Sequence, residues 1–132
     1  MNLKDKKILV AGGSGFLGPH VVKKLIERGA DKENIYAPRG EACDLRILEN
    51  CEKAVAGREL VLNLAGTTGN AQFHRDHPAE IFYDNLMIGI QLMEAARRAG
   101  VRKFISIGSA TEYPEHASLP YTEENLWLGF PA

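Results

Sequence analysis

Three glycines, Gly12, Gly15 and Gly18, follow directly on the apolar run at residues 8–11. Glycine backbone can turn sharply and approach a pyrophosphate closely, and the first N–H groups of a helix that begins there face the anion. The spacing therefore favours a dinucleotide-binding turn, with an ordinary strand-to-helix connector as the alternative reading. The residues expected to contact the cofactor in this turn are Gly12, Gly15, Phe16, Leu17 and Gly18.

The elements that position this turn are indicated by hydrophobic patterns along the rest of the chain. Short apolar runs predict strands at 8–11, 34–37, 59–65 and 103–107, with a poorly formed strand at 41–45. Apolar residues at helical spacing predict one helix from the glycine turn to Gly29, one at 46–56 and a long one at 78–99. The polar stretch 66–77 is expected to be a loop. Strands and helices therefore alternate throughout.

This alternation predicts an α/β fold, a doubly wound parallel sheet of the Rossmann type in a single domain at residues 1–113. Ligands of such sheets bind beyond the carboxyl ends of the strands, so the loops at 12–18, 65–69 and 108–111 should meet at one crevice. The last loop brings two hydroxyl side chains, Ser109 and Thr111, close to where a reactive cofactor ring would lie.

Composition favours a soluble globular protein with a small-molecule ligand. The 132 residues are 45% hydrophobic and 25% charged, with a formal net charge of -1. Because there is no long basic run, we expect neither nucleic acid nor an anionic membrane as a partner. No apolar stretch approaches the roughly 20 residues that span a bilayer, and residues 1–7 lack a signal-peptide core, so we expect a cytoplasmic protein. Cys43 and Cys51 match no usual zinc or redox spacing, and no metal site is expected.

Five stretches together resemble the extended short-chain dehydrogenase/reductases, which are NAD(P)-dependent epimerases, dehydratases and reductases of nucleotide-diphosphate sugars. The stretches are Gly12-Gly-Ser-Gly-Phe-Leu-Gly18, Asp44-Leu45, Leu62-Asn-Leu-Ala-Gly66, Tyr83-Asp-Asn85 and Gly108-Ser-Ala-Thr-Glu-Tyr-Pro114. Their order and spacing match the family over nearly the whole chain. Within it, the short loop after the second strand, the run at 83–88 and the pair Tyr113-Pro114 are most similar to the GDP-L-fucose synthases. The resemblance implies hydride transfer at the carbonyl of a nucleotide-diphosphate sugar.

The resemblance also implies roles for individual residues. Ser109 matches the catalytic serine that hydrogen-bonds the sugar oxygen at the reacting carbon, and a strand-end serine satisfied by backbone is the alternative. Asp44 and Leu45 match a pair beside the adenine, although Asp44 is equally suited to cap a helix. Asn85 and Thr111 match positions near the substrate, and Asn85 is also suited to bond neighbouring backbone. Further cofactor contacts are implied at Leu64, Ala65, Gly66 and Ile107.

Cofactor choice depends on the residue that follows the second strand. A carboxylate there binds the ribose hydroxyls of NAD, whereas an arginine suits the 2′-phosphate of NADP. This chain has Arg39 in that region. We therefore expect NADP, with NAD as the alternative and a solvated surface arginine as the other reading of Arg39.

Two departures from the family pattern affect the chemistry. Fucose synthases have an acid/base cysteine where this chain has Thr111, whose hydroxyl is a poor proton acceptor at neutral pH, and the triplet 109–111 is more similar to UDP-glucose 4-epimerases. None of the four tyrosines has a lysine four positions on, so the family's Tyr-x-x-x-Lys pair is absent. The chain as given therefore lacks the general acid/base, and we expect it to be inactive alone.

Chain length offers an explanation for this absence. We expect the chain to be the N-terminal portion of a longer enzyme, with residues 114–132 as a loose tail leading to the catalytic pair and a substrate domain. The alternative is a complete short protein that acts as a non-catalytic dinucleotide-binding module. The apolar stripe of the predicted helix at 78–99 forms a dimer interface in the family, which implies a homodimer here.

Overall fold

The computed structural model of the chain describes residues 2–130, so Met1 and the last two residues of the expected tail, Pro131 and Ala132, lie outside it. Four parallel strands form one sheet in the order β2-β1-β3-β4. The strands are β1 (Ile8–Ala11), β2 (Ile35–Tyr36), β3 (Leu60–Asn63) and β4 (Lys103–Ser106). The register places Ile8 opposite both Ile35 and Leu60, and Leu60 opposite Lys103. The parallel Rossmann-type sheet is therefore confirmed.

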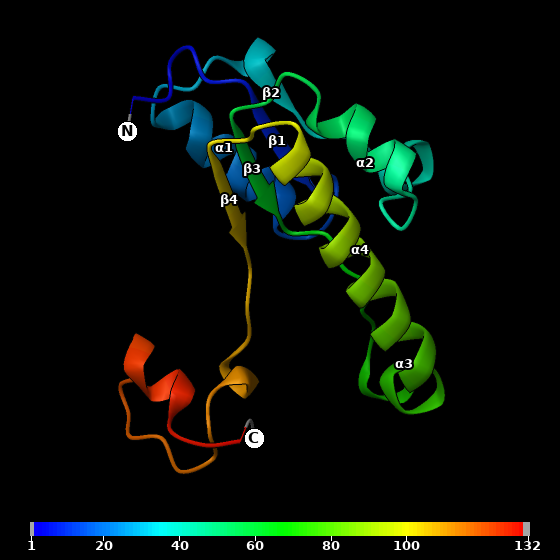
Figure 1. Cartoon of the computed structure of the whole chain (residues 1–132), viewed down its shortest axis with the longest axis vertical. Helices are drawn as coiled ribbons and strands as arrows, with labels where there is room; N and C mark the ends of the chain where they lie inside the picture. Colours follow the sequence, from blue (N-terminus) through cyan, green and yellow to red (C-terminus); the bar gives the residue numbers. More distant parts are fainter. Residues whose placement is uncertain (1, 131–132) are drawn as a thin grey trace.

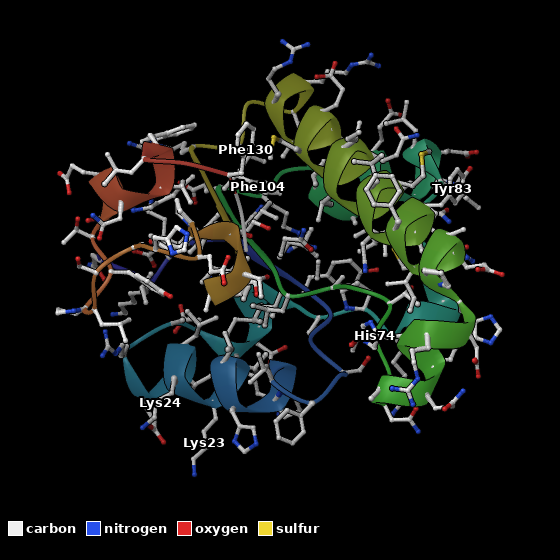
Figure 2. All side chains as sticks on the ribbon, turned by 90° about the horizontal axis from the view of Figure 1, so that it is seen from below. Lys23, Lys24, His74, Tyr83, Phe104 and Phe130 are labelled. Atoms are coloured by element: carbon white, nitrogen blue, oxygen red, sulfur yellow. The ribbon has the colours of Figure 1, made fainter. Side chains whose placement is uncertain are left out.

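Helices cover both faces of the sheet, with α1 on one face and the pair α2 and α4 on the other (Figure 1). The helices are α1 (Gly18–Glu27), α2 (Leu48–Val55), α3 (Ala71–Asp76) and α4 (Pro78–Arg98). The glycines at which helices were expected to end, Gly29, Gly57 and Gly100, all have positive φ angles, which glycine adopts without steric cost. Figure 2 shows Lys23 and Lys24 pointing outward from α1, as expected for the solvated side of a surface helix.

The uninterrupted apolar run of β1 is explained by burial on both faces of the sheet. Ile8 and Val10 pack in the core under α1, whereas Leu9 and Ala11 pack in the core shared by α2 and α4. All four side chains are fully buried. Strands of parallel sheets that are covered on both faces have this continuous pattern rather than an alternating one. The two cores hold β1 rigidly in the middle of the sheet, so the turn that follows it has a fixed starting point.

The prediction of a strand at 41–45 was wrong. Residues Gly40–Ala42 form a 3₁₀ helix, and Cys43 and Leu45 then bury their side chains in the core beside α2. Two buried residues around the partly exposed Asp44 produce the alternation of a strand, yet the burial comes from packing against the core rather than from a strand ladder. Within residues 2–130, β2 is therefore the edge strand on this side of the sheet.

The prediction of a loop throughout 66–77 also requires correction, because α3 lies within it. The side chain of Asn70 caps this helix, accepting a hydrogen bond of 2.9 Å from the N–H of Phe73. The Phe73 ring packs on the ring of His77, with 4.8 Å between the centroids. A single local cap thus begins a short helix in a stretch whose polar composition indicates a loop.

Beyond β4 the chain runs away from the end of the sheet into two 3₁₀ helices, at Ala110–Glu112 and Glu123–Trp127 (Figure 1). The rings of Tyr113 and Tyr121 stack within this segment, 4.5 Å apart. Whether residues from 114 onward form a unit separate from 1–113 stays a prediction. No helix among residues 2–130 is both long and apolar enough to cross a membrane.

Candidate functional site

The glycine turn between β1 and α1 brings three parts of the chain into direct contact. Gly12 has φ +75°, and a Cβ atom there would lie 2.8 Å from the backbone of Leu64 and Ala65. A Cβ on Gly18 would lie 2.3 Å from the backbone of Gly13, and one on Gly13 would lie 2.5 Å from the Cβ of Ala37. Distances this short are incompatible with a side chain. The turn is therefore packed directly against the backbone that follows β3 and against Ala37, which follows β2.

A cavity of about 650 Å³ opens beside this turn, at the carboxyl ends of β1 and β3. This volume is in the range of sites for small molecules and cofactors. Its position agrees with the rule that parallel sheets bind ligands beyond the ends of their strands. The lining residues are Gly12, Ser14, Gly15, Phe16, Leu17, Pro38, Gly40, Cys43, Asp44, Leu45, Arg46, Leu64, Ala65, Gly66, Thr67, Thr68 and Ile88.

The N-terminus of α1 also faces this region. The residue before the helix is Leu17, which lines the cavity and has no side-chain group to cap the first turn. The first N–H groups of a helix carry partial positive charge and are satisfied by a cap, by water or by a bound anion. A helix start without a side-chain cap, next to a glycine turn and a cavity, suits the phosphate groups of a ligand.

Most of the residues expected to contact a cofactor line this cavity. Gly18 is not among the lining residues. It lies against the backbone of Gly13, where it allows α1 to begin in close contact with the turn. Arg39 is exposed, and its neighbours Pro38 and Gly40 line the cavity while Arg39 is not among the lining residues. Ile107 is exposed, just after β4.

Sequence reasoning missed several residues of the cavity wall. They are Ser14, Pro38, Gly40, Cys43, Arg46, Thr67, Thr68 and Ile88. Thr67 and Thr68 lie in the loop that was expected to reach the crevice, so its position already indicated them. Arg46 follows directly on the Asp44-Leu45 pair, but nothing in the sequence indicates that its side chain turns back toward Asp44.

The hydroxyls of Ser109 and Thr111 lie close to each other, with 2.9 Å between the two oxygen atoms. Both residues are exposed, and neither lines the cavity. Of the three loops expected to meet, those at 12–18 and 65–69 do so, while the third wall comes from residues 38–46. The loop at 108–111 lies in the segment after β4, where the chain extends away from the end of the sheet (Figure 1). The substrate and catalytic roles of Ser109 and Thr111 stay predictions.

Asn85, on α4, holds the loop after β3. Its Oδ1 accepts a hydrogen bond of 2.7 Å from the N–H of Thr67, and its Nδ2 donates one of 2.9 Å to the carbonyl of the same residue. Both ends of the amide group are therefore engaged by the backbone of one cavity-lining residue. A contact between Asn85 and a substrate stays a prediction, but the structure gives this side chain a positioning function.

Charged groups at the cavity are concentrated around Asp44. Hydrogen bonds from the side chain and the backbone N–H of Arg46 hold the pKa of the Asp44 carboxyl below its usual range.

Burial raises the pKa of the Cys43 thiol in the cavity wall, and it raises the pKa of the Cys51 thiol to about 11. Both thiols are protonated at neutral pH and are poor nucleophiles. Within residues 2–130 no three His, Cys, Asp or Glu side chains gather to hold a metal ion.

The model of the NAD dependent epimerase/dehydratase family matches residues 8–129. This chain belongs to that family. Among curated relatives, it is 33% identical over 135 residues to GDP-mannose 3,5-epimerase of Arabidopsis thaliana, covering 93% of this chain and 36% of the relative. It is also 33% identical over 129 residues to GDP-L-fucose synthase of Sinorhizobium fredii, covering 96% of this chain and 40% of the relative.

Solved structures of enzymes named for GDP-sugar reactions share this fold. The GDP-mannoheptose C4 reductase MlghC from Campylobacter jejuni, solved with NADP bound, matches with a TM-score of 0.82 and 28% identity over 98% of this chain. A GDP-L-fucose synthetase from Naegleria fowleri bound to NADP matches with a TM-score of 0.72 and 30% identity, also over 98% of this chain. The chain spans 41% and 38% of those two proteins. It thus corresponds to well under half of the relatives that it matches.

Proposed function

We propose that the cavity binds NADP and that the chain is the NAD(P)-binding portion of a GDP-sugar epimerase/reductase. The observation that carries this proposal is the glycine turn, in which Gly12 and Gly18 leave no room for a Cβ atom beside a cavity of about 650 Å³. Curated relatives named for GDP-sugar reactions and solved relatives with NADP bound support it. The reaction class is hydride transfer at a sugar carbonyl, for which the bound cofactor supplies or accepts the hydride.

The residues present fit such a cofactor. Backbone N–H groups of Gly12, Gly15 and the first turn of α1 would hold the pyrophosphate. The two glycines line the cavity, and the N-terminus of α1 has no side-chain cap that would occupy its N–H groups. Asp44 and Leu45 would hold the purine. The apolar wall is completed by Leu64, Ala65 and Gly66, and Ile107 is proposed to lie near the reactive ring.

Ser109 is proposed to hydrogen-bond the sugar oxygen at the reacting carbon, with Asn85 and Thr111 near the sugar. The proton that accompanies hydride transfer requires a general acid/base. The family's Tyr-x-x-x-Lys pair has no match in these 132 residues. We therefore propose that the chain binds the cofactor without turning over a GDP- or UDP-sugar by itself. Measurable turnover by the chain alone would refute this.

A second candidate is a dinucleotide-binding module without catalysis, which the absence of that pair would favour only if these 132 residues were the whole gene product. A third, a portion of an enzyme similar to UDP-glucose 4-epimerases, is supported by Ser109-Ala110-Thr111. Binding of NADPH is common to all three. A continuation of the reading frame that carries a Tyr-x-x-x-Lys pair would decide for an enzyme over a binding module. Affinity of that longer protein for GDP-sugars over UDP-sugars, or the reverse, separates the first candidate from the third.

Arg39 is proposed to set the preference for NADP. Its guanidinium can donate charge-assisted hydrogen bonds to a 2′-phosphate, so NADPH should bind at least about tenfold more tightly than NADH. Arg39→Ala should reduce this ratio to about one, measured by isothermal titration calorimetry at constant salt. Arg28→Ala, at the exposed end of α1, is the matched control and should leave the ratio unchanged. Equal affinities for NADPH and NADH in the unchanged chain would refute the role of Arg39.

We also propose that the exposed side of α4 pairs two copies of the chain. Large apolar side chains recur on this helix at helical spacing and remain exposed: Phe82, Leu86, Ile90 and Met93. Tyr83 lies beside them on α4 (Figure 2). Light scattering should give twice the mass of the chain, and Ile90→Arg should restore the mass of a monomer. A monomer at all concentrations before any substitution would contradict the pairing.

A further inference from the structure

Arg46 joins two carboxylates that come from separate elements of the fold. Its Nε and NH2 groups donate hydrogen bonds of 2.9 and 2.7 Å to the two oxygens of Asp44, in the loop before α2. Its NH1 group donates one of 3.0 Å to Oδ1 of Asp84, on α4. The pairing with Asp44 is bidentate, which fixes orientation as well as distance. The guanidinium thus connects the loop at 43–46 to the long helix.

The contacts continue from α4 to the opposite wall of the cavity. The hydroxyl of Thr67 donates a hydrogen bond of 3.2 Å to Oδ2 of Asp84, and the backbone of Thr67 is held by Asn85. The side chain of Asp84 is only 17% exposed, so this carboxylate has little contact with water. A continuous series of hydrogen bonds therefore runs from Asp44 through Arg46 and Asp84 to Thr67. Asp44, Arg46 and Thr67 all line the cavity.

The charge balance argues against a phosphate as the partner of Arg46. One guanidinium faces two carboxylates, so the group carries a net negative charge and would repel a second anion. Three of the five N–H groups of Arg46 already donate to Asp44 and Asp84. The lowered pKa of Asp44 agrees with a carboxylate that stays ionised and is held by this arginine.

Asp44 keeps capacity for a further partner. Its Oδ1 accepts hydrogen bonds from both the backbone N–H and the Nε of Arg46, while Oδ2 accepts one of 2.7 Å from NH2 and a longer one of 3.2 Å from the same Nε. Because the Nε–H is shared between the two oxygens and the Asp44 side chain is 35% exposed, Oδ2 can still accept a bond from a neutral donor such as an exocyclic amino group. The direction of that free site is set by Arg46.

We propose that Arg46 is a positioning residue of the cofactor site, which orients the Asp44 carboxylate toward the purine and fixes the two cavity walls relative to each other through Asp84. The inference rests on the proposed function, since it takes the purine end of a dinucleotide as the ligand near Asp44. Arg46 acts through Asp44 and does not itself touch the phosphates. Loss of the Arg46 side chain should therefore weaken the binding only of ligands that contain the adenosine half of the dinucleotide.

The test is a double-mutant cycle on the dissociation constant of NADPH. Arg46→Gln should weaken NADPH binding about fivefold, the size expected for a half-exposed bidentate ion pair. In an Asp44→Asn background the same substitution should have a clearly smaller effect, because the carboxylate that Arg46 orients is gone and only the link from Arg46 to Asp84 is left to lose. Arg46→Lys keeps the charge without the bidentate geometry and should show an intermediate loss. Adenosine 2′,5′-bisphosphate should lose the same factor as NADPH, and nicotinamide mononucleotide should lose none.

The matched control is Arg97→Gln, which removes a similar bidentate pair with Glu94 near the end of α4, away from the cavity. It should leave the affinity for NADPH unchanged.

Equal losses of NADPH affinity from Arg46→Gln in both backgrounds, or no loss in either, would overturn the positioning role of Arg46 but not the proposed cofactor site. A loss for nicotinamide mononucleotide would point to a general structural defect and would overturn it too. Failure of the unchanged chain to bind NADPH would overturn the proposed function together with this inference.

Discussion

Replacing Gly18 by alanine should destabilise the fold by about 3 kcal/mol and abolish measurable binding of NADPH. The added Cβ would lie 2.3 Å from the carbonyl carbon and oxygen of Gly13, and these are backbone atoms that cannot rotate away. The start of α1 must therefore move off the turn after β1. That movement displaces the helix N-terminus and the glycine backbone that are proposed to hold the pyrophosphate.

Gly89→Ala is the matched control for this substitution. Gly89 lies in the interior of α4, and a Cβ atom there would meet nothing within 4 Å. Because alanine favours helices over glycine, this variant should gain about 0.5 to 1 kcal/mol. Urea denaturation monitored by circular dichroism measures both changes. If Gly18→Ala proves as stable as the unchanged chain, the close contact between turn and helix does not exist.

The second large effect is expected at Leu92, where alanine should lower the free energy of unfolding by about 3 kcal/mol. Leu92 is 0% exposed and packs in the core that joins α2 and α4 to the sheet. Truncation leaves a cavity among buried side chains that cannot fully collapse. The same helix carries Asp84 and Asn85, so a loosened α4 should also weaken the hold on the loop after β3.

The adjacent residue provides the comparison. Met93 is 54% exposed, and Met93→Ala should change the free energy of unfolding by less than about 0.5 kcal/mol under conditions where the chain is monomeric. Thermal and urea denaturation of the two variants side by side separate the loss of core packing from the loss of a surface side chain. Equal effects at Leu92 and Met93 would mean that α4 does not present Leu92 to the core.

The sequence was sufficient to predict the sheet and its glycine turn because both are locally encoded. The continuous apolar run of β1 reflects burial on two faces, and Gly12 is required by a positive φ angle. Helix ends at Gly29, Gly57 and Gly100 were predictable for the same local reason.

Other features depend on contacts that no local pattern contains. Cys43 and Leu45 alternate like a strand but are buried by the core beside α2. The link between Arg46 and Asp84 joins residues 38 positions apart. The position of the loop at 108–111 depends on where the chain goes after β4, which its hydroxyl-rich sequence does not indicate. The residues of the cavity wall that were missed come mainly from such long-range packing.

Binding of a nicotinamide dinucleotide in the cavity beside the glycine turn can be followed by amide chemical-shift mapping of the isotopically labelled chain during a titration with NADPH. We expect saturable shifts with one ligand per chain, largest at residues 12–17, 44–46 and 64–67. Absence of saturable shifts, or shifts confined to residues 114–130 or to the exposed side of α4, would contradict it.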